Sequence, residues 1–326
     1  MSTTVPERSA THEAPPPVEV LEPREVPLGG PRAMTVRRTL PQRRLSLIGA
    51  WCFLDHYGPD DVGADGRHGM VVPGHPHTGL ATVTWLFEGE VEHRDTTGAV
   101  AIVRPGEVDL MTAGDGVAHS EYSTPATRRL HGAQLWLALP DAERRGPRRF
   151  EQDRPAPVRS GPAEVIVFLG SWLGTTARPR TATAVLGAEV RLPAGSTWSA
   201  PVPGGYELGV LVDAGRIRVE GVPVEPARLA ALPAGRDRLE IEVLPGEDAR
   251  LLVLGGEPLD EPIVMWWNFV ARSHEEIVAA RDDWQRQVEG ERSSDAADGR
   301  FGPHPEAWHD VLPAPELPTV RLRPRE

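Results

Sequence analysis

Short apolar runs separated by Gly, Pro and Asp residues recur along most of this chain. In the first half, the run 81–87 is followed by turn residues at 88–90, and Pro105-Gly106 precedes a further run. The pattern restarts at Val165 with runs such as VIVFLGSW and RLEIEV, separated by Pro-Ala-Gly or Leu-Pro-Gly turns. Runs of this length and punctuation are typical of antiparallel strands in barrels and sandwiches. The pattern therefore predicts an all-β protein with two antiparallel β-barrel domains.

The composition of the segments between these runs indicates the domain boundaries. Residues 1–30 are rich in Pro, Glu, Ser and Thr and carry few aromatics, so they bury too little apolar surface to offset the entropy of ordering. The two halves resemble each other loosely, which indicates an internal duplication. We expect a disordered segment at 1–30, a first barrel at 31–142, a linker at 143–163, a second barrel with a helix at 164–290, and a Pro-rich tail at 291–326.

One segment after the second barrel carries a helical signature. Ser273 is a good N-cap, and Glu276, three residues further on, completes a capping box. Apolar residues recur at helical spacing and form one stripe, made of Ile277, Ala280, Trp284 and Val288. We therefore expect a helix at 273–289 that packs onto a barrel. In the tail beyond it, the residues suited to docking onto the body are Trp308, Val311 and Leu312.

Two pairs of potential metal ligands lie in the first barrel, and each pair has one residue between its members: His75 with His77, and His119 with Glu121. On an extended strand, residues i and i+2 point to the same face, so each pair can direct both its members at one point. Three imidazoles and one carboxylate that converge form a transition-metal site. Residues 132–273 contain no histidine, so the second barrel has no imidazole-based site of its own.

The residues alone leave the identity of the metal open. Zinc prefers four-coordinate sites that often include cysteine, and no cysteine joins this set. Three histidines and one glutamate suit Fe(II), Mn, Co, Ni or Cu, and they do not exclude Zn. An octahedral ion with four protein ligands keeps two positions for water, substrate or O₂. The pattern therefore predicts a site that can do chemistry as well as bind a metal.

Five stretches carry a family resemblance: LDHYGPDD at 54–61, HPHTGLATVTWLFEGEVEHRD at 75–95, PGEVDLMTAGDGVAHSE at 105–121, LHGAQLWLALP at 130–140 and GGEPLDEPIVMWWNFV at 255–270. In these stretches the chain resembles the pirin family of the cupin superfamily, over about residues 35 to 290. The resemblance implies a bicupin, with two jelly-roll domains and a C-terminal helix. It also implies that iron, as Fe(II), binds the residues matching the family's ligands, which are His75, His77, His119 and Glu121.

The chain departs from the family pattern in three places. A glutamate common four residues after the second histidine is replaced by Ala81, which we expect to change the surroundings of the metal and not its ligand count. Trp266 and Trp267 separate Met265 from Asn268, where many pirins have Asn directly after the Val-Met pair. The tail after about residue 290 has no counterpart in the pattern.

The resemblance implies two functions that share the same ligands. In the first, the protein is a metal-dependent dioxygenase of the quercetin 2,3-dioxygenase type, which uses O₂ and a small aromatic or enol substrate, with Glu121 as general base. In the second, it is an iron-dependent, redox-sensitive regulatory protein that binds transcription factors or metabolic enzymes. A third function, a non-redox isomerase or sugar-binding cupin, would need no O₂. We favour the dioxygenase.

Several further residues are candidates for the substrate pocket or its surroundings. His56, in LDHYGP, is a candidate substrate contact at the pocket mouth. Met111 and Ala113, at i+2 spacing, are candidates for an apolar wall near the metal. His93 has charged neighbours on both sides, so we expect it to be exposed. Trp85 and Trp136 are expected in the core.

The net charge and the cysteine content indicate which classes of partner and which cellular compartment to expect. The net charge is −12, lysine is absent, and the arginine pairs lack interleaved aromatics, so we expect no direct nucleic-acid binding. No apolar run approaches ~20 residues, and the N-terminal residues lack the pattern of a secretory signal, so we expect no membrane contact. The single Cys52 excludes an internal disulfide and fits a buried thiol in a reducing cytoplasm.

Overall fold

Strands of the first half of the chain form two facing antiparallel sheets, which make the N-terminal domain. The structure is a computed structural model that describes residues 17–28, 34–62, 69–290, 299–308 and 310–325. The larger sheet has, in spatial order, β12 (Arg149–Asp153), β9 (Val108–Thr112), β6 (Leu80–Glu88), β11 (Arg129–Ala138), β4 (Trp51–Asp61), β3 (Thr35–Leu40) and β2 (Arg24–Pro27). The smaller has β5 (Val71–His77), β10 (Val117–Ser123), β7 (Val91–Asp95) and β8 (Val100–Val103).

The C-terminal domain repeats this arrangement. Its larger sheet has, in order, β1 (Glu19–Leu21), β21 (Leu229–Leu232), β18 (Glu207–Ala214), β23 (Ala249–Gly256), β16 (Val185–Leu192), β14 (Ala163–Trp172) and β13 (Val158–Ser160), and β15 (Thr175–Thr176) pairs with β14. Its smaller sheet has β17 (Thr197–Pro201), β22 (Arg238–Val243), β19 (Ile217–Val219) and β20 (Val222–Val224). The predicted pair of antiparallel jelly-roll domains is confirmed, although the sheets face each other without closing into barrels.

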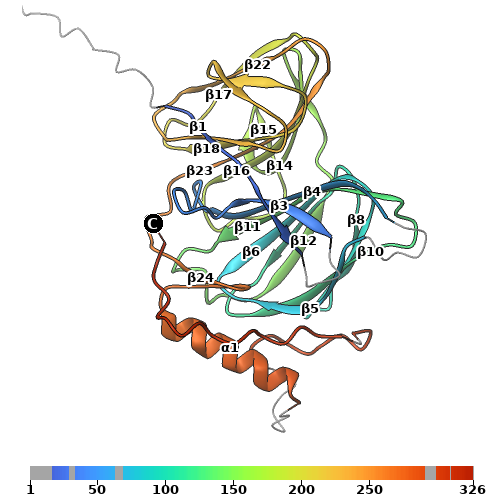
Figure 1. Ribbon diagram of the computed structural model, residues 1–326, viewed down its shortest axis with the longest axis vertical. Coiled ribbons are helices and arrows are strands. Elements are labelled where there is room, and N and C mark those ends of the chain that lie inside the picture. The colour runs from blue at the N-terminus through green and yellow to red at the C-terminus, as the bar shows by residue number, and fades with distance from the viewer. Residues whose placement is uncertain (1–16, 29–33, 63–68, 291–298, 309, 326) are drawn as a thin grey trace, which may run out of the picture.

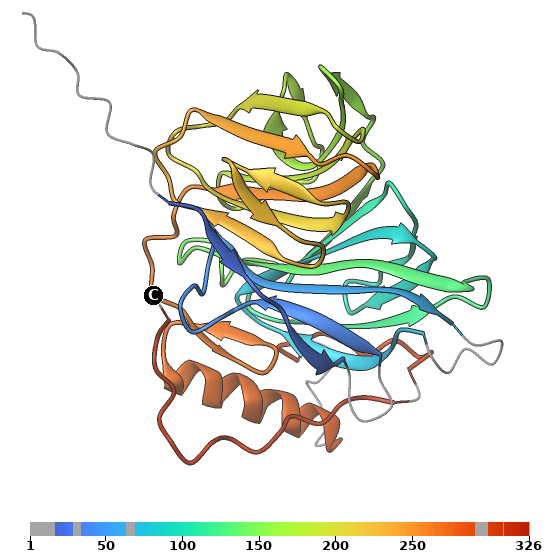
Figure 2. The ribbon, with the colours of Figure 1, turned by 45° about the horizontal axis from the view of Figure 1, so that its top comes forward.

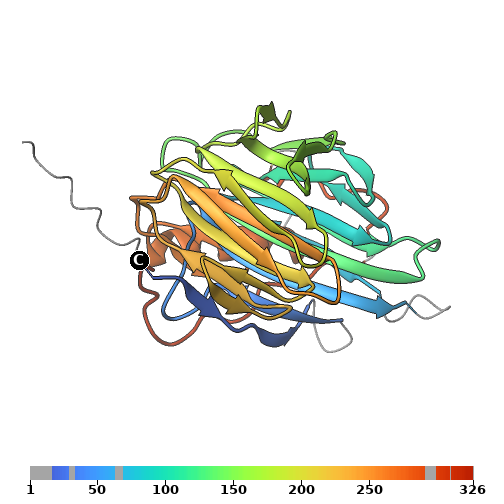
Figure 3. The same cartoon turned by 90° about the horizontal axis from the view of Figure 1, so that it is seen from above.

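The two large sheets pack against each other and share one apolar core (Figure 1). In β6, Val83 and Trp85 face this shared core, whereas Thr84 on the alternate face points into the N-terminal domain. The Trp85 ring stacks on Phe168 of the other domain at 4.6 Å between centroids. Figure 3 shows the strands of the C-terminal domain in front of those of the N-terminal domain and running in broadly the same direction. The four sheets therefore form consecutive layers, and the interior of the N-terminal domain is separate from the domain interface.

Two segments expected to be irregular contain strands. The prediction of disorder at 1–30 is wrong for residues 17–28, where β1 pairs with β21 and β2 pairs with β3; residues 1–16, 29 and 30 lie outside the described chain. The prediction of a linker at 143–163 is also wrong in part, because β12 pairs with β9 and β13 with β14. A short segment that adds to the edge of an existing sheet gains hydrogen bonds without building a core of its own, which composition alone does not reveal.

The predicted helix is confirmed as α1 (His274–Val288), the only helix longer than a turn among the described residues. The Ser273 hydroxyl accepts the N–H of Glu276 at 3.2 Å. The Glu276 carboxylate, however, accepts the N–H of Arg272, one residue before the N-cap, so the capping box is displaced by one position. Ile277 and Trp284 are buried as predicted. The helix is too short and too polar to cross a membrane.

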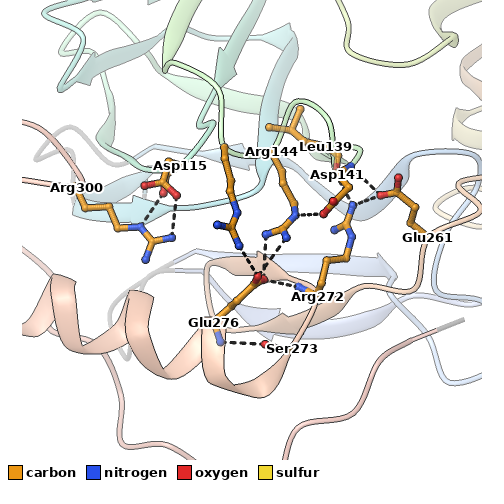
Figure 4. Close-up of polar contacts among 10 residues, drawn as sticks. Asp115, Leu139, Asp141, Arg144, Glu261, Arg272, Ser273, Glu276 and Arg300 are labelled. Atoms are coloured by element: carbon orange, nitrogen blue, oxygen red, sulfur yellow. Dashed lines mark hydrogen bonds and ion pairs between the residues drawn. The ribbon is translucent and has the colours of Figure 1, made fainter.

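Ion pairs fasten α1 and the tail to the N-terminal domain (Figure 4). Glu276 accepts hydrogen bonds from Arg144, at 3.0 and 3.1 Å, and from Arg145, at 2.8 Å. Arg300, at the start of the described tail, pairs with Asp115 at 3.2 Å. Figure 2 shows α1 and the tail lying along one side of the N-terminal domain. The polar contacts hold this side of the molecule against the sheet that carries β5 and β10.

The tail docks back onto the body as expected. Val311 forms a parallel bridge with Gly74 of β5, and the N–H of Leu312 donates to the Gly74 carbonyl at 2.8 Å. The indole N–H of Trp284 donates to the carbonyl of Leu312 at 2.8 Å. Trp308 is half-buried and packs in the same cluster. The tail thereby covers the outer edge of the small sheet of the N-terminal domain.

Candidate metal centre

The four predicted ligands lie on two strands that are neighbours in the small sheet. β5 carries His75 and His77, and β10 carries His119 and Glu121. The strands pair antiparallel, with His119 opposite His75, and the register shifts between His119 and Glu121. Because residues i and i+2 share a face, this pairing brings both ligand pairs to the same side of the sheet, facing the interior of the N-terminal domain.

Three imidazoles converge on one point. One ring nitrogen from each of His75, His77 and His119 lies within 4.8 Å of the other two, and all three side chains are buried. The Nε2 atoms of His77 and His119 are 3.1 Å apart. Two nitrogens that each bind a metal at about 2.1 Å, at a right angle, are separated by about 3.0 Å. The histidine spacing therefore fits adjacent positions around one transition-metal ion.

The outer nitrogens of two of these histidines are held by backbone carbonyls. His75 Nδ1 lies 2.9 Å from the Pro73 carbonyl oxygen, and His77 Nδ1 lies 3.1 Å from that of Asn268. A carbonyl only accepts, so both Nδ1 atoms carry the proton and both Nε2 lone pairs remain for a metal. Asn268 lies between the short strands β24 (Val264–Trp266) and β25 (Phe269–Ala271), so this hairpin takes part in orienting His77.

The third imidazole is oriented by a histidine relay. His119 Nδ1 lies 3.4 Å from His93 Nδ1, and His93 Nε2 lies 3.0 Å from a carboxylate oxygen of Asp95. The carboxylate accepts the His93 Nε2–H, which leaves His93 Nδ1 to accept from His119. The relay therefore also leaves the Nε2 lone pair of His119 for the metal.

Glu121 lies on the same strand as His119 and lines the same cavity, but it is not in the group that joins His75, His77 and His119, so the structure brings together three of the four predicted ligands. Its carboxylate forms a second potential ligand group with His119 and His93, and it accepts a hydrogen bond from the Thr84 hydroxyl at 3.2 Å. Burial raises the pKa of Glu121. Burial also lowers the pKa of His75 to about 4 and holds those of His77 and His119 well below the ordinary value. The imidazoles are thus neutral near pH 7, which is the form that binds metals.

A cavity of about 410 Å³ opens beside these four residues. Phe53 and Trp136 stack in its wall at 4.0 Å between centroids, and Trp136 meets the ring of His77 edge-on at 5.1 Å. The remaining lining residues come from six separate stretches of the chain and are Pro27, Leu28, Arg38, Val72, Gln134, Trp267, Asn268, Leu312 and Pro313. The cavity wall combines apolar and polar groups in similar measure, an arrangement that can bind and orient a small organic molecule.

A second histidine cluster lies at the domain interface and differs chemically from the first. One carboxylate oxygen of Asp213 lies 2.8 Å from His56 Nε2 and 2.6 Å from His131 Nε2. Arg37 and Arg250 each contact the Nδ1 atom of one of these histidines at 3.3 Å. A guanidinium only donates, so both Nδ1 atoms accept and both protons lie on Nε2; the Nε2–H of His56 donates to Asp213. This interdomain His–Asp cluster therefore forms hydrogen bonds between the domains and offers no free imidazole lone pair to a metal.

Comparison with known proteins places the chain in a family. The family model Pirin matches residues 33–137, and the model Pirin C-terminal cupin domain matches residues 187–290. The chain belongs to the pirin family. A relative from Pseudomonas aeruginosa, named as a candidate quercetin 2,3-dioxygenase, is 40% identical to this pirin over 90% of this chain and 89% of its own.

Two further similarities extend the comparison. The crystal structure of a quercetin 2,3-dioxygenase from Acinetobacter baumannii has 35% identity and a TM-score of 0.85, covering 94% of this pirin and 97% of that chain. Human pirin is 29% identical over 78% of this chain and 88% of its own. These likenesses confirm the bicupin fold that the sequence motifs imply, over nearly the whole chain.

The sequence assigned three residues to the substrate pocket that the structure places elsewhere. His56 belongs to the interdomain His–Asp cluster, because its partner Asp213 comes from the other domain. Met111 and Ala113 face the interior but pack with Val117 and Phe150 and do not line the cavity. Only the folded chain shows these partners, so the pocket assignment of all three was wrong.

Two other expectations change in the structure, and one is confirmed. Ala81 packs in the core between the domains, so it does not alter the surroundings of the metal as expected. Trp85 and Trp136 are both buried in apolar clusters as expected, and Trp136 also lines the cavity. His93 is buried, with 2% of its surface exposed, and the expectation that it is exposed was wrong. It shares its strand parity with the buried Asp95, and this alternation was the signal available in the sequence.

The histidine relay predicts the effect of removing His93. We expect His93→Ala to weaken metal binding about 10- to 100-fold, the usual cost of losing a partner that orients a ligand. Asp95→Asn should act in the same direction, because the Thr97 N–H holds the one remaining oxygen and the amide NH₂, which cannot accept, then faces His93 Nε2. Competition with a chelator would measure the metal dissociation constant. Arg94→Ala, on the same strand but ion-paired at the surface with Glu92, is the control; equal affinities in all variants would contradict the relay.

The buried Asp109 carboxyl should make the free energy of unfolding decrease as the pH rises. Its carboxyl is 2% exposed, and neither oxygen has a hydrogen-bond partner among the described residues. Burial raises its pKa to about 7, so the folded chain holds a proton that the unfolded chain releases above its ordinary pKa of about 4. Stability therefore falls as pH rises from about 4 to 7. We expect Asp109→Asn to remove this fall.

The measurement is denaturant unfolding of the metal-free protein at pH 5 and pH 8. At about 1.4 kcal/mol per pKa unit, the two units between pH 5 and 7 make the advantage of Asp109→Asn about 3 kcal/mol larger at pH 8. Asp260→Asn, on an exposed aspartate, is the control. The same difference from wild type at both pH values would show that Asp109 is ionised in the fold.

Proposed function

We propose that this pirin is a metal-dependent dioxygenase of the quercetin 2,3-dioxygenase type that acts on a small polyphenol or enol. The observation that carries the proposal is the convergence of three neutral imidazole lone pairs beside a buried carboxylate and an open cavity. The donor set suits Fe(II), our first choice of metal, and also Mn, Co, Ni or Cu. The names of the similar proteins supply quercetin as the test substrate.

Different side chains around the cavity would have different roles in such a reaction. A bound metal would supply Lewis acidity and a place where substrate and O₂ meet. Glu121 is placed to take the hydroxyl proton of the substrate, since its raised pKa makes it a better base than an exposed carboxylate. The hydroxyl oxygen of Thr84 lies 3.2 Å from a carboxylate oxygen of Glu121 and 2.9 Å from the side-chain oxygen of Gln134. When the Thr84 hydroxyl donates to Glu121, it stabilises the ionised form of that carboxylate.

The apolar wall would position the substrate. The Phe53 and Trp136 rings stack next to His77, and the Arg38 guanidinium lies over the Phe53 ring at 4.4 Å from its centroid. An aromatic substrate that contacts this wall would gain contact area at little entropic cost and exclude water from the ligands. Arg38 is held by two 2.7 Å hydrogen bonds to Asp55, so its guanidinium is a fixed donor at the cavity wall and not a free charge.

The test is anaerobic loading with Fe(II), Mn, Co, Ni or Cu in turn, followed by quercetin and then O₂. We expect loss of the flavonol absorbance together with release of carbon monoxide for at least one metal. Glu121→Gln should lower kcat/KM about 10²- to 10⁴-fold, the range for a lost general base, whereas Glu92→Gln, at the surface of β7, should not. Metal binding without turnover for all five ions would reject the dioxygenase and favour a regulatory protein.

A further inference from the structure

Part of the cavity wall comes from segments that the family models do not match. The matches begin at residue 33 and end at residue 290. Pro27 and Leu28 precede the first match, and Leu312 and Pro313 follow the second, yet all four line the cavity beside the ligands. The candidate ligands therefore lie inside the matched regions, whereas this part of the wall lies outside them.

The tail is attached directly beside a metal ligand. The N–H of Gly74, the residue before His75, donates to the carbonyl of Asp310 at 3.3 Å, and the N–H of Leu312 donates to the carbonyl of Gly74 at 2.8 Å. Trp308 covers Gly74 so closely that a Cβ atom there would lie 2.6 Å from its ring. The tail therefore extends the small sheet beyond β5 at the level of the metal ligands.

The helix holds the tail from its other side. The indole N–H of Trp284 donates to the carbonyl of Leu312 at 2.8 Å, and the N–H of Ala314 donates to the side chain of Gln285 at 3.2 Å. Both partners belong to α1, which Glu276 ties to the N-terminal domain (Figure 4). Fixed on two sides, Leu312 and Pro313 form a rigid part of the wall.

We propose that Leu312 and Pro313 determine which ligands this pirin accepts, by forming a wall contact for planar polyphenols of more than one ring. We expect further rings to carry a metal-bound ligand across the cavity and to add contacts with Leu312 and Pro313, which line it together with the candidate ligands. We expect a single-ring ligand to depend on these two residues less than a ligand of several rings does. This inference rests on the proposed function for the choice of ligand class.

The test compares two probes on the metal-loaded protein without O₂: quercetin, with three rings, and catechol, with one. Tryptophan fluorescence quenching measures their dissociation constants. We expect Leu312→Trp to weaken quercetin binding at least about tenfold by narrowing the cavity, and Leu312→Ala to weaken it several-fold by removing a contact. Both variants should leave catechol binding within about twofold. Leu317→Ala is the control, since Leu317 also belongs to the tail, packs in the apolar cluster that contains Trp308 and Val311, and does not line the cavity.

Metal content, measured for every variant, separates an effect on the wall from an effect on the ligands. The assignment would be overturned if the dissociation constants of both probes changed equally, or if neither changed. It would also be overturned if the metal-loaded wild type did not bind quercetin. Adding O₂ to the same samples separates this inference from the proposed function. If the Leu312 variants lose quercetin binding selectively and the wild type shows no turnover, the role of Leu312 and Pro313 is supported and the dioxygenase is rejected. If the wild type turns quercetin over and the variants affect both probes equally, the dioxygenase is supported and the role of Leu312 and Pro313 is rejected.

Discussion

Replacing His119 with alanine is expected to abolish tight metal binding. His119 is the member common to both potential ligand groups, the one with His75 and His77 and the one with Glu121. Since loss of a partner that merely orients a ligand costs about 10- to 100-fold in affinity, loss of the ligand itself should cost more than about 100-fold. The measurement is the metal content after dialysis, together with a chelator competition titration.

The interdomain His–Asp cluster supplies the control for this prediction. His131→Asn also removes a buried histidine of the N-terminal domain, but its partners are Asp213 and Arg250 and not the metal ligands. We expect this variant to keep its metal while losing thermal stability. If His119→Ala retained metal as well as His131→Asn does, the three imidazoles would not form the binding site.

Replacing Asp213 with alanine is expected to give the largest loss of stability. Asp213 accepts hydrogen bonds from His56 and Arg250 and lies 2.6 Å from His131 Nε2, so its removal leaves buried donors of both domains without an acceptor. Breaking a buried charge network by removing one partner typically costs about 3–5 kcal/mol. Because both domains share one core, a weaker interface should lower the stability of the whole chain.

Denaturant unfolding of the metal-free protein checks this prediction. Asp213→Asn keeps one oxygen acceptor in place and should cost less than Asp213→Ala. Asp237→Ala, at an exposed position before the same domain's β22, should change the free energy of unfolding by less than about 0.5 kcal/mol. Metal content should stay at the wild-type level in all three variants. An Asp213→Ala protein as stable as wild type would mean that the cluster is incidental to domain packing.

The candidate site could be predicted from the sequence because its ligands are encoded locally. His75 and His77 share a face of one strand, as do His119 and Glu121 of another, and strand geometry alone imposes this relation. The burial of His93 was also encoded, in its parity with Asp95, but its charged neighbours obscured the signal. Helix α1 was equally local, since its cap and apolar stripe lie within one segment.

Relations between distant segments could not be read in this way. His56 and Asp213 are 157 residues apart, and nothing near either residue indicates that the two large sheets will bring them together. The same holds for Asn268, which orients His77 from 191 residues away, and for Leu312 beside β5.

By itself, the sequence determined the β architecture, the helix and the four candidate ligands, because periodicity and spacing act within single elements. The tertiary structure alone decided which residues surround those ligands. The relay behind His119, the wall made by the tail and the cluster between the domains all depend on how sheets pack and pair. Those arrangements are set by burial summed over the whole chain, so no single segment carries them.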